Sequence, residues 1–222
     1  MASKYLPSRE TTYFARLSKL VVDVFCDILR EVLKAKVPPP GLTAILQSQR
    51  VQLSNNLENR QRHVLYPAGG VFVGTLKDLD FTLLYRLVRH IQGINIPPHQ
   101  NGWGKTPDTA DRSLSANIDR LRIQRNEAYG HLPTASLSDS DFHSRWSLIR
   151  QSVLEIERDA LTGDTYVTAV YGLLTVSMDP EAQKKYIEKL EKQHKVDLEV
   201  RGQCFTKCLT IIDLVCEYLS KS

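Results

Sequence analysis

The segment 114–131 reads LSANIDRLRIQRNEAYGH and decides how the rest of the chain is interpreted. Its apolar residues Leu114, Ile118 and Leu121 recur at steps of four and three, which is the period of a helix with one buried face. The next position on that face is Arg125. Because an unpaired guanidinium removed from water costs several kcal/mol, Arg125 is expected to meet a carboxylate, a second subunit or the phosphate of a ligand.

The end of this segment brings a histidine close to the arginine in sequence. Gly130 is typical of a helix terminus and Pro133 cannot continue a helix, so we predict that the helix ends here. His131 would then lie on a turn that folds back beside Arg125. An imidazole titrates near neutral pH, so the pair would place a cation and a base near one point.

A purely structural role for both residues is the alternative. Arg125 could form a buried ion pair with one of three acidic residues, Asp80, Asp119 or Glu127. His131 could face the dipole at the end of its helix, and Asp80 could be an ordinary N-cap. The pattern of the segment leaves these readings open.

The remainder of the chain shows helical periodicity and no convincing strand. Apolar residues at helical spacing predict a long first helix from Phe14 to Val32, ended by the prolines at 38–40. Further helices are expected around 42–46, 80–91, 111–131, 139–156, 166–174, 181–194 and 205–219, with acidic caps at Asp111 and at Asp139 or Asp141. We therefore predict an all-α helical bundle forming one domain, residues 1–222, with a C-terminal helical extension at about 160–222.

Composition bounds the class of protein. A chain of 222 residues with 42% hydrophobic residues is long enough to bury a full core. It has no run of roughly eighteen apolar residues, and its N-terminus lacks an apolar signal region. Its four cysteines show no disulfide-framework spacing: Cys26, Cys204, Cys208 and Cys216. These features predict a soluble, cytoplasmic protein without membrane contact. The net charge of +4 suits transient contact with RNA, and it argues against strong nonspecific nucleic-acid binding.

The spacing of Arg125, Asn126 and His131 resembles the R-x(4-6)-H signature of the HEPN superfamily. The flanking sequence resembles, within that superfamily, the HEPN domain of the type found in the DAZ-interacting ubiquitin ligase. The segments that carry this resemblance are Leu65-Tyr66-Pro67, Asp80 to Ile91, Gly102-Trp103, Pro107, Asp111 to Arg122, and Phe142 with Trp146. They span residues 65–156, and the resemblance implies a HEPN-type helical bundle.

The resemblance also implies a metal-independent endoribonuclease that acts as a homodimer, in which the motifs of two protomers face one cleft. His131 would act as general acid or base, and Arg125 would stabilise the negative charge of the transition state. Asn126 would orient the imidazole or contact phosphate, unless it is a solvent-facing amide. A catalytically silent module that binds RNA, a nucleotide or a protein partner is the alternative.

Four further residues are predicted to contact the substrate. Asp80 matches an acidic position of the resembled domain, and Arg120 and Arg122 could flank a phosphate track. Tyr129 follows the motif arginine, although a tyrosine there is more often part of the core. No carboxylate, histidine or cysteine cluster has metal-ligand spacing, so we expect no metal and no cofactor. RNA surveillance, defence and immune-type signalling, with protein partners, are the settings that the resemblance implies.

Overall fold

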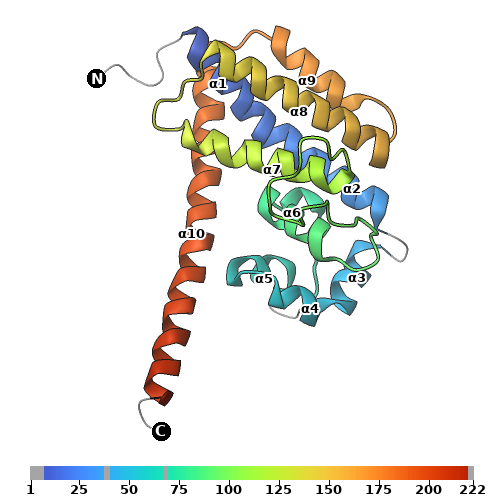
Figure 1. Ribbon diagram of the computed structural model, residues 1–222, viewed down its shortest axis with the longest axis vertical. Coiled ribbons are helices and arrows are strands. Elements are labelled where there is room, and N and C mark those ends of the chain that lie inside the picture. Colours follow the sequence, from blue (N-terminus) through green and yellow to red (C-terminus); the bar gives the residue numbers. More distant parts are fainter. Residues whose placement is uncertain (1–7, 38–40, 68–69, 220–222) are drawn as a thin grey trace.

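The computed structural model describes residues 8–37, 41–67 and 70–219, with side chains as far as residue 199. In these residues every regular element is a helix and no strand occurs, which confirms the all-α class (Figure 1). The elements are α1 (Arg9–Lys19), η1 (Leu20–Val24), α2 (Phe25–Lys36), α3 (Leu42–Ser48), α4 (Arg50–Asn55), α5 (Asn59–Leu65), η2 (Leu76–Asp78), α6 (Phe81–His90), α7 (Leu114–Gly130), α8 (Asp139–Ala160), α9 (Thr165–Thr175) and α10 (Pro180–Leu219).

The long first helix is confirmed, but it is not a uniform α-helix. Between α1 and α2 the chain makes a π-helical turn, η1, and all three elements follow one continuous path. We call these three elements together the rod. It buries a row of large apolar side chains that belong to the hydrophobic core: Phe14, Leu17, Leu20, Phe25, Ile28 and Leu29. The prolines expected to end it, 38–40, lie outside the described residues. The rod therefore provides the surface on which α6, α8 and α10 pack.

Two short helices, α4 and α5, occur where the sequence pattern showed only a polar segment. Each is anchored by sparse apolar residues, Leu53 in α4 and Leu65 in α5, with Leu57 between them, and all three are buried. So few apolar residues do not produce a recognisable helical period in the sequence. With α3, these helices form a lower lobe beneath α6 (Figure 1).

The helix caps are partly as expected. Asp80 is the N-cap of α6 and accepts the Leu83 N–H at 2.8 Å. The acidic caps predicted for the next two helices are wrong, because Ser113 caps α7 and Ser138 caps α8 through their hydroxyl groups. Asp111 instead accepts the backbone N–H groups of Ser113 and Gln100 and so connects two parts of the loop before α7. Hydrogen bonds from Ser113 and Gln100 lower the pKa of Asp111 to about 2.

The C-terminal part of the chain differs from the two separate helices that its pattern predicted. Residues 180–219 form the single helix α10, which runs through Gly202 without a break. A glycine inside a helix costs only about 1 kcal/mol, so it does not end one. The first half of α10 packs against α1 and buries Ile187 and Leu190. No helix of the described residues is long and apolar enough to cross a membrane.

We predict that Glu157→Ala lowers the free energy of unfolding by about 2–3 kcal/mol, measured by urea denaturation. Glu157 is buried in α8, and its carboxylate accepts the backbone N–H groups of Tyr166 and Val167 at 2.6 and 2.9 Å. Alanine would leave both donors at the start of α9 unpaired. The exposed Glu188→Ala on α10 serves as the control and should stay within about 0.5 kcal/mol of wild type. Equal effects of the two variants would contradict this role.

Candidate functional site

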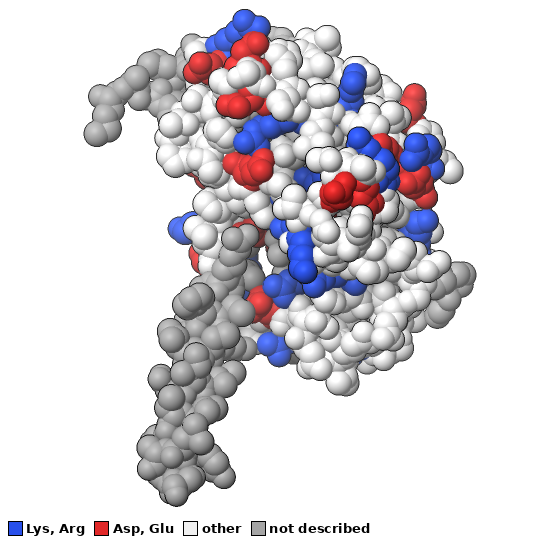
Figure 2. Space-filling view, viewed as in Figure 1, with Lys and Arg blue, Asp and Glu red and all other residues white. Residues whose placement is uncertain are grey.

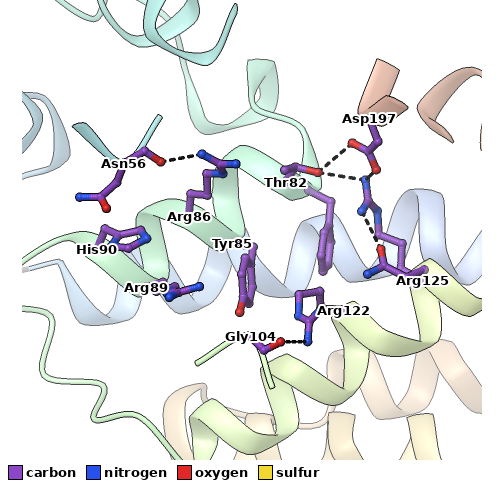
Figure 3. Close-up of a pocket in the computed structure, with 12 residues that line it drawn as sticks. Asn56, Thr82, Tyr85, Arg86, Arg89, His90, Gly104, Arg122, Arg125 and Asp197 are labelled. Carbon is purple, nitrogen blue, oxygen red and sulfur yellow. Dashed lines mark hydrogen bonds and ion pairs between the residues drawn. The ribbon is translucent and has the colours of Figure 1, made fainter. Parts of the chain in front are cut away.

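Arg125 lies on the buried face of α7, as its sequence position predicted, with 4% of its surface exposed. Its Nη2 forms an ion pair with Asp197 of α10 and donates to the Thr82 hydroxyl at 3.1 Å (Figure 3). Its Nη1 donates to the Asn126 side-chain oxygen at 3.4 Å. The charge is thus met by a carboxylate, but by none of the three that sequence proximity had suggested.

Asp197 of α10 contacts three side chains from two other helices, α6 and α7. It accepts hydrogen bonds from Thr82 of α6 and from the Tyr129 hydroxyl of α7, both at 2.9 Å, in addition to Arg125. The guanidinium of Arg125 lies 4.8 Å from the ring centre of Phe81 and 5.0 Å from that of Tyr129. Burial raises the pKa of Tyr129, so its hydroxyl remains a donor. These contacts fasten α10 over the motif helix.

The helix ends at Gly130 and His131 begins a turn, as predicted, but among the described side chains no contact joins His131 to Arg125. As the C-cap of α7, His131 has φ −90° and ψ −5°. The His131 ring lies on the side of α7 that faces α1 and α8. There its Nε2 lies 3.4 Å from Nη2 of Arg145, and its ring centre lies 6.4 Å from that of Phe14. In one chain the two motif residues have separate surroundings.

A cleft of about 470 Å³ opens between α6, α7 and the loop before α7; we call it the arginine cleft. Four arginines line it: Arg86 and Arg89 from α6, and Arg122 and Arg125 from α7. Figure 3 shows them around one space together with Asn56, Thr82, Tyr85, His90, Gly104 and Asp197. In Figure 2, Lys and Arg side chains gather in the hollow between α7 and the lower lobe.

Besides Arg125, two more of these arginines are fixed by partners. Arg86 pairs with Glu58 at 3.2 Å and donates to the Asn56 carbonyl at 2.6 Å. Arg122 pairs with Asp119 at 2.6 Å and donates to the Gly104 carbonyl at 2.9 Å. Arg89 is exposed, and within the described part of the chain no carboxylate pairs with it. The cleft therefore combines one arginine without a carboxylate partner with three that have one.

Asp119 organises the wall of the cleft from beneath and is completely buried. Its carboxylate receives the Tyr85 hydroxyl at 2.8 Å, the backbone N–H of Gly104 at 2.9 Å and Nε of Arg122 at 2.6 Å. Nε2 of His99, also buried, lies 3.1 Å from its second oxygen. This carboxylate holds the 99–104 loop against α7 and aims Arg122 along the cleft.

The other predicted site residues divide between the cleft and the framework. Asn126 and Arg122 line the cleft, and Tyr129 supports Asp197 from the core. Asp80 acts as the cap of α6. Arg120 is buried, and its guanidinium donates to the Asn117 side chain and to the carbonyls of Asp108 and Asp111, so the loop before α7 occupies it.

Arg86, Arg89 and His90 were missed by the sequence reasoning. Residues 82, 85, 86, 89 and 90 follow one face of α6 at helical spacing, so the polar face of that helix carried the signal. Burial, with the charges of Arg89 and Arg86, lowers the pKa of His90. Among the described residues no group of three or more histidine, cysteine, aspartate or glutamate side chains could hold a metal ion.

Comparison with known proteins places the chain beside one family. A family model described as DZIP3/hRUL138-like HEPN matches residues 39–186, from before α3 into α10. The human E3 ubiquitin-protein ligase DZIP3 is 26% identical over 155 residues, and the mouse protein of that name is 24% identical over 155 residues. These alignments cover 65% of this chain but 12% of either relative, so the chain spans a small part of their length. No solved structure gives a significant match.

A double-mutant cycle should show that Arg125 and Asp197 depend on each other. Arg125→Met and Asp197→Leu should each lower the free energy of unfolding by about 3 kcal/mol, because each leaves one buried charge unpaired. The double variant should lose at least about 1.5 kcal/mol less than the sum of the two, measured by urea denaturation. The exposed pair Lys34 and Glu31, 2.6 Å apart, is the control and should couple by less than about 0.5 kcal/mol. Strictly additive losses at Arg125 and Asp197 would count against the pair.

Proposed function

Because the chain belongs to the DZIP3/hRUL138-like HEPN family, we propose that it is an RNA- or nucleotide-binding module that holds phosphate in the arginine cleft. The observation that carries this proposal is the convergence of four arginines on one cleft, where Arg89 has no carboxylate partner among the described residues. Guanidinium groups bind phosphate with paired, charge-assisted hydrogen bonds. A cleft of this composition favours an anionic ligand over a neutral or cationic one.

The arrangement of the arginines supports the same conclusion. Glu58 and Asp119 hold Arg86 and Arg122 in place before any ligand arrives, so little side-chain entropy is lost on binding. Arg89, which no carboxylate of the described residues pairs with, adds a further positive charge to the same cleft, and the amide of Asn126 adds a neutral polar group at the Arg125 end. The phosphate is therefore proposed to lie nearest Arg89, away from the carboxylate of Asp197.

An endoribonuclease is the second candidate, favoured by the presence of Arg125, Asn126 and His131 in one R-x5-H motif. Binding is the stronger proposal, because Arg125 is paired with Asp197 while His131 contacts Arg145 and Phe14. Cleavage would require a homodimer in which a second copy supplies the histidine, and it would require Arg125 to exchange its carboxylate for phosphate. Ubiquitin ligation, the activity for which the relatives are named, belongs to proteins of which this chain matches 12%.

The binding proposal predicts different outcomes for two arginine variants and the motif histidine. Arg89→Ala should weaken binding of a single-stranded RNA by about five- to tenfold, measured by fluorescence anisotropy. It should also reduce the slope of log affinity against log salt by about 0.7, the loss of one phosphate contact. His131→Ala should bind like wild type, because its ring lies away from the cleft.

The matched control for Arg89→Ala is Arg158→Ala, an exposed arginine on α8 that does not line the cleft. It should leave both the affinity and the salt slope unchanged. If Arg89→Ala behaves like Arg158→Ala while His131→Ala loses binding, the arginine cleft is not the RNA site and the motif end of α7 takes its place.

RNA affinity should rise by about three- to tenfold as pH falls from about 7.5 to 5.5. The lowered pKa of His90 keeps its ring neutral at pH 7.5 in the free protein, and a bound phosphodiester favours the charged ring. Protons are then taken up on binding, so affinity increases towards acid pH. The charged groups that act on the ring are Arg89 and Arg86. His90→Gln should abolish the pH dependence in the same anisotropy titration, and an unchanged pH profile would exclude His90.

A further inference from the structure

Three hydrogen-bond donors of α6 and α7 point at one place at the Arg125 end of the arginine cleft. The Thr82 hydroxyl donates to one oxygen of Asp197, and Nη2 of Arg125 and the Tyr129 hydroxyl donate to the other (Figure 3). Thr82 also accepts from Arg125, so its own hydrogen is directed at the carboxylate. A guanidinium and two hydroxyl donors around one point form a site for an oxyanion. We call these three donors the oxyanion site.

The oxyanion site borders the cleft, and its occupant comes from a later part of the chain. Thr82, Arg125 and Asp197 all line the arginine cleft. The three donors lie within residues 39–186, which the family model matches, whereas Asp197 lies beyond that match. The carboxylate of Asp197 therefore takes, from outside the family domain, a place that an anionic ligand of the cleft could reach.

The segment of α10 that carries Asp197 has little apolar contact with the body of the protein. Of residues 191–199, whose side chains the structure describes, Asp197 alone is buried, and the buried apolar residues of α10 come before this segment. A cavity of about 430 Å³ lies between the segment, α5 and the start of α6. Farther along, Glu199 pairs with Arg60 at 3.4 Å, but both side chains are about half exposed, so this pair contributes little.

The closer contacts of the segment centre on Asp197. The carboxylate meets Arg125 through Nη2 alone, and Nε of Arg125 is buried without a partner among the described residues. Guanidinium groups bind oxyanions best through two parallel hydrogen bonds, so this ion pair is not the strongest arrangement open to Arg125. His194 adds a ring stack on Tyr129, with 4.4 Å between the ring centres. The segment is thus held chiefly by a charge that another anion can replace.

We propose that Asp197 is an internal competitor of the ligand: on RNA binding, a phosphate group takes its place on the oxyanion site and residues 191–199 of α10 move away. This inference rests on the proposed phosphate binding in the arginine cleft, and it adds how that binding is regulated. A phosphodiester has two unesterified oxygens, as a carboxylate does, so it can accept from the same three donors. The closed form lowers the apparent affinity in proportion to the fraction of open molecules.

Removing the charge of the competitor should strengthen binding. Asp197→Asn should raise the affinity for oligouridylate at least about fivefold, measured by fluorescence anisotropy, because a neutral amide competes less well for the guanidinium. Glu188→Gln removes one negative charge from an exposed position of the same helix and should change the affinity by less than about twofold. Unchanged or weaker binding by Asp197→Asn would overturn the proposal.

A second substitution separates contact with the oxyanion site from a general effect of charge. Thr82→Val keeps the shape of the side chain and removes its hydroxyl donor. It should weaken oligouridylate binding at least about threefold more in the Asp197→Asn background than in wild type, because the phosphate reaches the donor only when the carboxylate has left. An equal effect in both backgrounds would mean that the gain comes from lost negative charge alone, and the proposal would be wrong.

The movement of α10 can be measured without any substitution. When the whole chain is saturated with oligouridylate, amide hydrogen exchange should become faster in residues 191–199, because a released helical segment opens more often. Residues 180–190 should exchange as before, since Ile187 and Leu190 remain buried against the core. Unchanged or slower exchange in residues 191–199 would contradict the release of this segment.

Failure of this proposal differs from failure of phosphate binding near Arg89. If Arg89→Ala weakens RNA binding and Asp197→Asn does not strengthen it, the arginine cleft binds RNA and Asp197 is not a competitor. If Asp197→Asn strengthens binding while Arg89→Ala behaves like Arg158→Ala, the oxyanion site binds the phosphate and Arg89 does not.

Discussion

Removing a guanidinium from water costs free energy unless its charge is paired. The pairing of Arg125 determines which segments pack around α7. Arg125 lies on the buried face of α7, and among the described residues the carboxylate of Asp197 alone forms an ion pair with it. Because Asp197 is on α10, the ion pair holds that helix against α6 and α7, where Thr82 and Tyr129 complete the carboxylate's hydrogen bonds. The same pair lines both the arginine cleft and a second cavity, of about 430 Å³, between α5, α6 and α10.

A second buried carboxylate performs the complementary task within α7 itself. Asp119 faces the 99–104 loop and Arg122, and its contacts convert a loop without helix or strand into one fixed wall of the cleft. The two acids thus have opposite effects on the arginines they hold. Asp119 leaves the outer edge of Arg122 facing the cleft, whereas Asp197 encloses Arg125 almost completely. This difference explains why the side chain of Arg125, 4% exposed, is less accessible than that of Arg122, 20% exposed, on the same helix.

The sequence was sufficient for the helical class, the buried position of Arg125 and the cap at Asp80, because each depends on periodicity or on neighbours within one helix. It was insufficient wherever the answer depended on segments far apart in the chain. Asp197 lies 72 residues beyond Arg125, and no local pattern relates the two. The helix end at Gly130 was predicted correctly, but the surroundings of His131 were not, because the turn places its ring near Phe14 of α1 and Arg145 of α8, which the segment itself does not reveal.

The position of Asp197 along a straight helix has a consequence for how this chain can vary. Ile187 and Leu190 anchor α10 on the core, and Asp197 follows them at a fixed number of residues. Inserting one residue between Leu190 and Asp197 would rotate the carboxylate by about 100° and advance it by about 1.5 Å. The acid would then face another direction while every residue type was preserved. The fold therefore fixes the number of residues between Leu190 and Asp197. We expect insertions and deletions in this segment to be tolerated less well than substitutions of its exposed residues.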